Sequence, residues 1–98
     1  MQDDAKRIEE EGARITALDS TLDVKRAPYL KSQLLFATHM LDDAASALQH
    51  AQKAAPRDTS MWMGFAEMNI QSAVQRRQKV QDAVDKYGGP DNIVEIGD

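Results

Sequence analysis

The chain has 98 residues, a formal net charge of −4 and no cysteine. This length is typical of one domain with a limited core, and the lack of cysteine excludes disulfides, thiolate metal sites and cysteine nucleophiles. An acidic chain is a poor default binder of nucleic acid, since phosphate neutralisation needs a basic face. The acidic start carries no apolar signal segment and no stretch is long and apolar enough to cross a membrane, so we expect a cytoplasmic protein.

Residues 3–22 are predicted to form the first helix. Asp3 and Asp4 suit its start, because acidic side chains interact favourably with the N-terminal end of the helix dipole. One face is apolar, through Ile8, Ile15, Leu18 and Leu22. Three acidic residues are expected mostly on the opposite side, at Glu9, Glu10 and Glu11.

Residues 28–55 are predicted to form the second helix, which begins at Pro28 and is ended by Pro56. Apolar residues recur along it at alternating steps of four and three, at Leu30, Leu34, Ala37, Leu41, Ala44, Leu48, Ala51 and Ala55. This spacing is typical of a helix that packs against another helix. The alternate alanines allow a close approach of the partner backbone.

A turn at residues 57–60, with Asp58 or Thr59 as the helix cap, is expected to lead into a third helix over 60–87. Gly88, Gly89 and Pro90 form a strong stop signal. The third helix has its own stripe at Met63, Ala66, Ile70, Ala73, Arg77, Val80, Val84 and Tyr87, in which only Arg77 is charged. The remaining tail, residues 88–98, contains three apolar residues that are able to pack against the helices as an extended segment: Ile93, Val94 and Ile96.

These elements predict a single all-α domain of residues 1–98. Two long helices joined by a short connection form an antiparallel hairpin, and the first helix lies across one face of it. Arg77 then falls close to Asp42 and Asp43, and we expect it to pair with one of them.

A cluster of methionine and aromatic residues opens the third helix: Met61, Trp62, Met63, Phe65 and Met68. Such side chains are adaptable and are enriched at binding surfaces. They form either core against the first helix or an interface. We expect Met61, Trp62, Phe65 and Met68 to be an interface, through which two hairpins assemble into a homodimeric bundle.

Basic residues form two short runs, at Lys25, Arg26 and Lys31 and at Arg76, Arg77 and Lys79. Either run is able to contact phosphate. No aromatic residue stands between the arginines, so stacking on single-stranded nucleic acid is not indicated.

A third class of site uses His39, Asp43 and Glu67 as metal or small-ligand contacts. The repeated Glu-x-x-His signature of di-iron bundles is absent, because positions 36 and 47 are Phe and Ala. We therefore predict no metal, no cofactor and no catalytic residue.

Two local patterns resemble known families. Ala44, Leu48, Ala51 and Pro56, followed by Trp62, Phe65 and Ala66, are similar to a tetratricopeptide linker, and Pro90 follows Pro56 by the 34-residue period of that repeat. The chain departs from the repeat at Gln78, Asp82 and Asp85. Trp62-Met63-Gly64 with Tyr87 and Asp91 resembles the helical-hairpin proteins secreted by type VII systems, although Gly64 lies within a predicted helix. We assign the chain to neither family.

The function that these features favour is a non-catalytic module of protein–protein interaction, an adaptor or chaperone-like assembly subunit that associates with itself or with another protein. The alternatives are a nucleic-acid-associated regulator with contacts at Lys25, Arg26, Arg76, Arg77 and Lys79, and a ligand- or metal-binding bundle.

Overall fold

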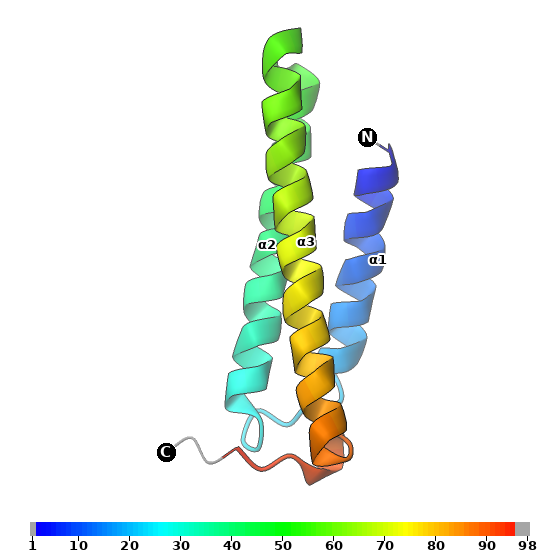
Figure 1. Cartoon of the computed structure of the whole chain (residues 1–98), viewed down its shortest axis with the longest axis vertical. Helices are drawn as coiled ribbons and strands as arrows, with labels where there is room; N and C mark the ends of the chain where they lie inside the picture. The colour runs from blue at the N-terminus through cyan, green and yellow to red at the C-terminus, as the bar shows by residue number, and fades with distance from the viewer. Residues whose placement is uncertain (1, 96–98) are drawn as a thin grey trace.

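The computed structural model describes residues 2–95, which form an all-helical unit (Figure 1). Three α-helices follow one another as α1 (Gln2–Asp19), α2 (Pro28–Lys53) and α3 (Pro56–Tyr87), with a short 3-10 helix at Pro90–Asn92. Helices α2 and α3 form a long antiparallel hairpin, and α1 packs along it. The unit measures 50 × 24 × 17 Å. This confirms the predicted fold class.

The contact between α2 and α3 is formed by most of the two predicted stripes, without Ala55, which lies beyond the end of α2, and Tyr87, which is 42% exposed. The buried residues of α2 are Leu30, Leu34, Ala37, Leu41, Ala44, Ala47, Leu48 and Ala51, and those of α3 are Ala66, Ile70, Ala73, Val80 and Val84. Four alanines in these stripes, at positions 37, 44, 66 and 73, are completely buried. Their small side chains let the two helices approach closely, as the spacing predicted.

The connection at the closed end of the hairpin differs from the prediction. Helix α2 ends at Lys53 and α3 begins at Pro56, so only Ala54 and Ala55 connect them, both in extended conformation. Pro56 starts α3, and neither Asp58 nor Thr59 caps it. Proline suits the first helical position because its φ is already helical and no backbone donor is needed there, while it holds the preceding residue extended.

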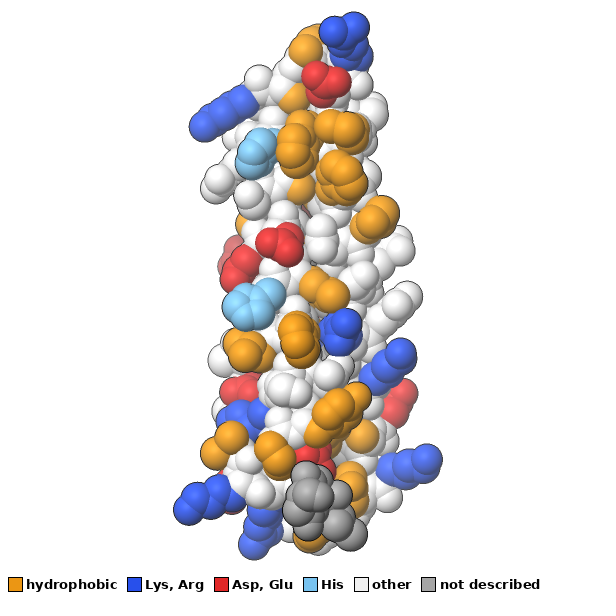
Figure 2. Space-filling model, turned by 90° about the vertical axis from the view of Figure 1, so that its left-hand side faces the viewer, with side chains coloured by type: hydrophobic (Ala, Val, Ile, Leu, Met, Phe, Trp, Pro, Cys, Tyr) orange, Lys and Arg blue, Asp and Glu red, His pale blue; other side chains and the backbone are white. Residues whose placement is uncertain are grey.

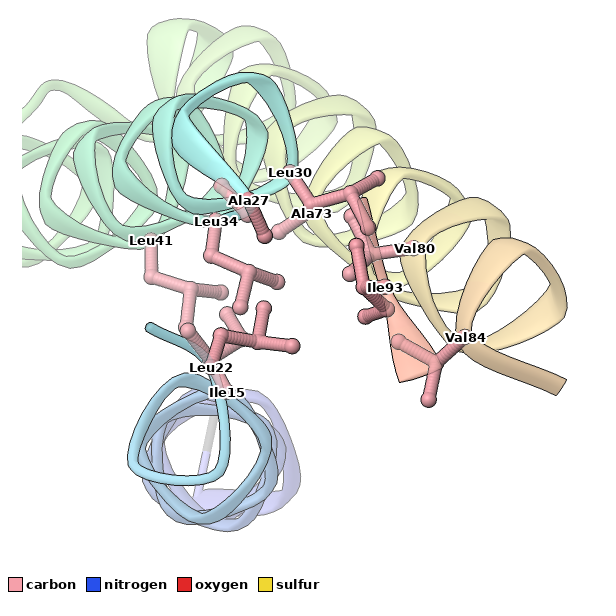
Figure 3. Packing of buried hydrophobic residues seen from close by; sticks show 11 residues of the cluster. Ile15, Leu22, Ala27, Leu30, Leu34, Leu41, Ala73, Val80, Val84 and Ile93 are labelled. Carbon is pink, nitrogen blue, oxygen red and sulfur yellow. The ribbon is translucent and has the colours of Figure 1, made fainter. Parts of the chain in front are cut away.

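Helix α1 joins the core through its apolar face. Ile15 and, just beyond the end of α1, Leu22 point toward Leu34 and Leu41 of α2 (Figure 3). Ile8 contacts the upper part of the core, near Ala44 and Ile70. The helix ends at Asp19, three residues before the predicted end, and residues 20–27 lead to α2.

The segment after α3 folds back under the hairpin. Gly88 and Gly89 adopt φ values of 89° and 128°, which side chains disfavour, and reverse the chain. Ile93 is completely buried and lies among core residues of α2 and α3 (Figure 3). The Glu95 carboxylate accepts hydrogen bonds from the backbone amides of Tyr29 (2.6 Å) and Leu30 (3.0 Å), at the start of α2. The predicted packing of the tail is thus confirmed at Ile93 and wrong at Val94, whose side chain is 64% exposed, whereas Ile96 lies outside the described residues.

Replacing Glu95 with alanine is expected to lower the free energy of unfolding by about 1 kcal/mol, since α2 has no side-chain cap of its own and the carboxylate satisfies two of its first amides. Urea denaturation followed by circular dichroism measures this. Val94→Ala is the matched control, because the Val94 side chain is exposed. Equal effects of the two substitutions would show that the carboxylate is not a cap.

Within residues 2–95, no helix has the length and apolarity that crossing a membrane requires.

Candidate functional site

The closed end of the hairpin extends beyond the N-terminal end of α1 (Figure 1). Here lie the four side chains predicted as an interface, which we call the tip cluster: Met61, Trp62, Phe65 and Met68. Three of them are strongly exposed, with exposed fractions of 50% for Met61, 43% for Phe65 and 62% for Met68. Within the described chain, α1 therefore leaves most of this cluster uncovered.

Trp62 anchors the tip cluster to the hairpin. Its ring stacks on His50 of α2, with ring centroids 4.4 Å apart and an interplanar angle of 25°. Phe65 meets the edge of the same ring at 5.7 Å. Trp62 also packs against the core beside Ala47 and Leu48, so its half-buried ring is held in place. The result is a fixed aromatic group flanked by flexible methionines, an arrangement suited to contact with another apolar surface.

A shallow hollow of about 310 Å³ adjoins Trp62 at the end of the molecule. Its lining combines the ring with polar and charged side chains and is formed by Gln49, His50, Lys53, Ala54, Asp58 and Trp62. The hollow is open to solvent and continues the surface of the tip cluster.

Apolar side chains continue from the tip along the side of the hairpin that faces away from α1 (Figure 2). On this side Phe36 is 53% exposed, and the Arg76 guanidinium lies 5.4 Å from the centre of its ring. Arg76 also donates a hydrogen bond of 2.7 Å to the Gln33 side chain. We call this surface of α2 and α3, which includes Gln33, Phe36 and Arg76, the open face.

Arg77 does not pair with Asp42 or Asp43, contrary to the prediction. Its Nε donates to the Glu11 carboxylate of α1, and the Glu11 side chain is only 2% exposed. Arg14 is a further, more distant partner of Glu11 at 3.5 Å. Glu11 thus faces the core rather than solvent, which also corrects its predicted place on the polar side of α1. Glu11 in the apolar stripe of α1 and Arg77 in the apolar stripe of α3 thus neutralise each other across the contact between the two helices.

A second ion pair joins α1 to α3 nearer the tip. Arg7 donates to both carboxylate oxygens of Glu67, at 2.7 and 2.9 Å, and also contacts Asp4. The hydrogen bond from Arg7 lowers the pKa of Glu67 below its usual value of 4.5. Both side chains remain about two-fifths exposed, so solvent screens the pair.

This pair makes a pH-dependent contribution to stability. Because the folded-state pKa of Glu67 is lowered, the contribution is present above pH 4.5 and is lost as the pH falls through the lowered pKa. We expect Glu67→Gln to cost less than about 1 kcal/mol at pH 6, and the difference from the parent protein to shrink toward pH 3. Thermal unfolding at several pH values measures this. A difference that stayed constant with pH would contradict the assignment.

The basic residues predicted to contact nucleic acid do not act as one group. Arg77 is bound by Glu11, Arg76 by Gln33, and Arg26 donates to the backbone oxygen of Asp91 at 3.0 Å. These interactions use the side chains of three of the five residues within the fold. The side chains of Lys25 and Lys79 take part in none of the hydrogen bonds of the described chain, and Lys25 donates only through its backbone amide, to Asp23.

The proposed metal contacts at His39, Asp43 and Glu67 are not brought together either. Glu67 is occupied by Arg7. Residues 2–95 contain no group of three or more histidine, aspartate or glutamate side chains placed to hold a metal ion.

Several residues of this site escaped the prediction. Glu11 follows Ile8 by three residues and precedes Ile15 by four, so its place in the apolar stripe of α1 could have been recognised from spacing. Together with Arg77, it formed a pair of opposite charges in two apolar stripes. His50 and Phe36 carried no such signal, because their contacts depend on the register between α2 and α3.

The comparisons with known proteins add no relative: no family model, no curated protein and no solved structure matches the chain.

Proposed function

We propose that the protein is a non-catalytic module of protein–protein interaction that associates with itself through the tip cluster and the adjoining open face. The observation that supports this most directly is the exposure of Met61, Phe65 and Met68 around a fixed tryptophan. Apolar side chains that gather in one place on a small domain are a common mark of an interface.

The arrangement of charge supports the same proposal. The two ion pairs that join α1 to α3, formed by Arg7 with Glu67 and by Arg77 with Glu11, both hold α1 on the opposite side of the hairpin. The open face is consequently not required for the docking of α1. A partner is able to bind there while the three-helix unit stays intact.

Trp62→Ala is expected to weaken self-association by at least tenfold, since a tryptophan that is packed in place is a typical hot spot of an interface. Light scattering over a concentration series measures the mass, and circular dichroism measures the retained helicity. Met68→Ser provides a second variant whose side chain is outside the core.

Leu35→Ala is the matched control, because Leu35 is also exposed (59%) but is not part of the tip cluster. We expect this variant to associate like the parent protein. A parent protein with the mass of one chain at every concentration would overturn the proposal, as would tip variants that associate normally.

A further inference from the structure

The open face is organised as a ladder. Phe36, Asp43 and His50 follow one another at seven-residue intervals on α2, as do Trp62, Asn69 and Arg76 on α3. Residues seven apart lie on the same side of a helix, about 10 Å along its axis. His50 contacts Trp62 and Phe36 contacts Arg76, so both series lie on the same side of the hairpin and at matching levels.

We call each level a rung. From the tip downward the rungs are His50–Trp62, Asp43–Asn69, Phe36–Arg76 and, one further interval along, Tyr29–Ala83. Bulky and small members alternate along α3, since Trp62 and Arg76 are large while Asn69 and Ala83 are small. Charge alternates as well, because the second rung carries an acid and the third a base.

When a second copy runs in the opposite direction, its basic third rung lies opposite the acidic second rung of the first copy. We infer that a second copy of the chain docks on the open face in antiparallel orientation, about a two-fold axis that passes near Met40. The closed end of each hairpin then lies against the opposite end of the other. The inference rests on the proposed self-association and adds its geometry. The first rung of one copy then meets the fourth rung of the other, and the second meets the third.

Two of the contacts in this arrangement, one on each helix, have a direct physical reason. On α3, Trp62 faces the small Ala83 of the second copy, so the ring has room. On α2, Asp43 faces Phe36 of the second copy, over whose ring the Arg76 guanidinium already lies. The second rung of one copy and the third rung of the other thus bring an acidic and a basic side chain together. The two-fold axis generates a second, identical contact.

The charges of the open face favour this occupant. None of the ion pairs within the described chain uses Asp43 or Arg76. A parallel, tip-to-tip dimer would instead place Asp43 against Asn69 of the second copy, so that the acid would meet no base. The four rungs span about 30 Å, long enough for an interface near the usual ~800 Å² per partner.

Disulfide trapping tests the orientation directly, because the chain has no cysteine of its own. Tyr29→Cys and His50→Cys chains are mixed and oxidised, and the mixed disulfide is quantified by mass spectrometry. The antiparallel dimer places these positions opposite one another, whereas in a tip-to-tip dimer they lie about 30 Å apart along the axis. His50→Cys mixed with Leu35→Cys is the control, since Leu35 is not on a rung.

A charge exchange provides the second measurement. Asp43→Arg and Arg76→Glu are each expected to raise the dissociation constant of the dimer roughly tenfold, and the double variant to restore it to within about threefold. Light scattering over a concentration series measures the dissociation constant of the two single variants and of the double variant. Rescue in the double variant requires the two positions to meet, which loss of folding would not imitate.

The outcomes separate this inference from the proposed function. A dimer that forms the mixed disulfide well above the control and shows charge rescue supports the antiparallel arrangement. A dimer that shows neither the mixed disulfide nor charge rescue overturns the antiparallel arrangement and leaves the proposed self-association unaffected. A parent protein that remains a single chain overturns both.

Discussion

Replacing Arg77 with methionine is expected to lower the free energy of unfolding by about 3 kcal/mol or more. The substitution leaves the Glu11 carboxylate, 2% exposed, without its main partner in the contact between α1 and α3. Breaking a buried ion pair by removing one member is strongly destabilising, because the remaining charge is neither hydrated nor compensated. Urea denaturation followed by circular dichroism measures the loss.

Two further variants show whether the buried charge is the cause. Arg14→Met removes a 56%-exposed and more distant partner of Glu11, and it is expected to cost less than about 1 kcal/mol. The double variant Glu11→Leu with Arg77→Met is expected to recover most of the stability, since an apolar pair of similar size often replaces a buried ion pair without loss. A single Arg77 variant as stable as the parent protein would refute the explanation.

Leu34→Ala is expected to cost about 3 kcal/mol. Leu34 is 1% exposed and lies where α2 meets both α1 and α3, within the cluster that contains Ile15 and Val80. Removing three carbon atoms from such a place loses their burial and leaves a cavity that packed helices fill only in part. The midpoint of urea denaturation is expected to fall accordingly.

The neighbouring residue is a matched control for this prediction. Leu35 has the same side chain on the same helix but is 59% exposed. Leu35→Ala is expected to change stability by less than about 1 kcal/mol. Similar losses for the two variants would mean that Leu34 is not in the core of the folded protein in solution.

The two ion pairs between α1 and α3 differ in what they contribute. The Glu11–Arg77 pair is buried in the contact between α1 and α3. The Arg7–Glu67 pair is exposed and titrates in acid. Loss of this pair in acid is therefore expected to loosen the N-terminal end of α1, the end that lies nearest to the tip cluster.

Much of the fold follows from local patterns in the sequence. The alternation of four and three between Leu30 and Ala51 determines which side of α2 is buried, because it matches the helical period. Pro28, Pro56 and the glycines at 88 and 89 place the ends of the helices to within a few residues. The tip cluster was recognised by composition, and its role as an interface stays a prediction.

Other features were decided only by tertiary structure. The partner of Arg77 depends on how α1 is placed against the hairpin, since Glu11 lies 66 residues away in the chain. The His50–Trp62 stack and the Phe36–Arg76 contact depend on the register of α2 against α3, which a two-residue connection sets. Glu95 reaches the start of α2 because Ile93 is buried beneath it. A helical period specifies which residues share a face, but the pairing of faces depends on packing between distant segments.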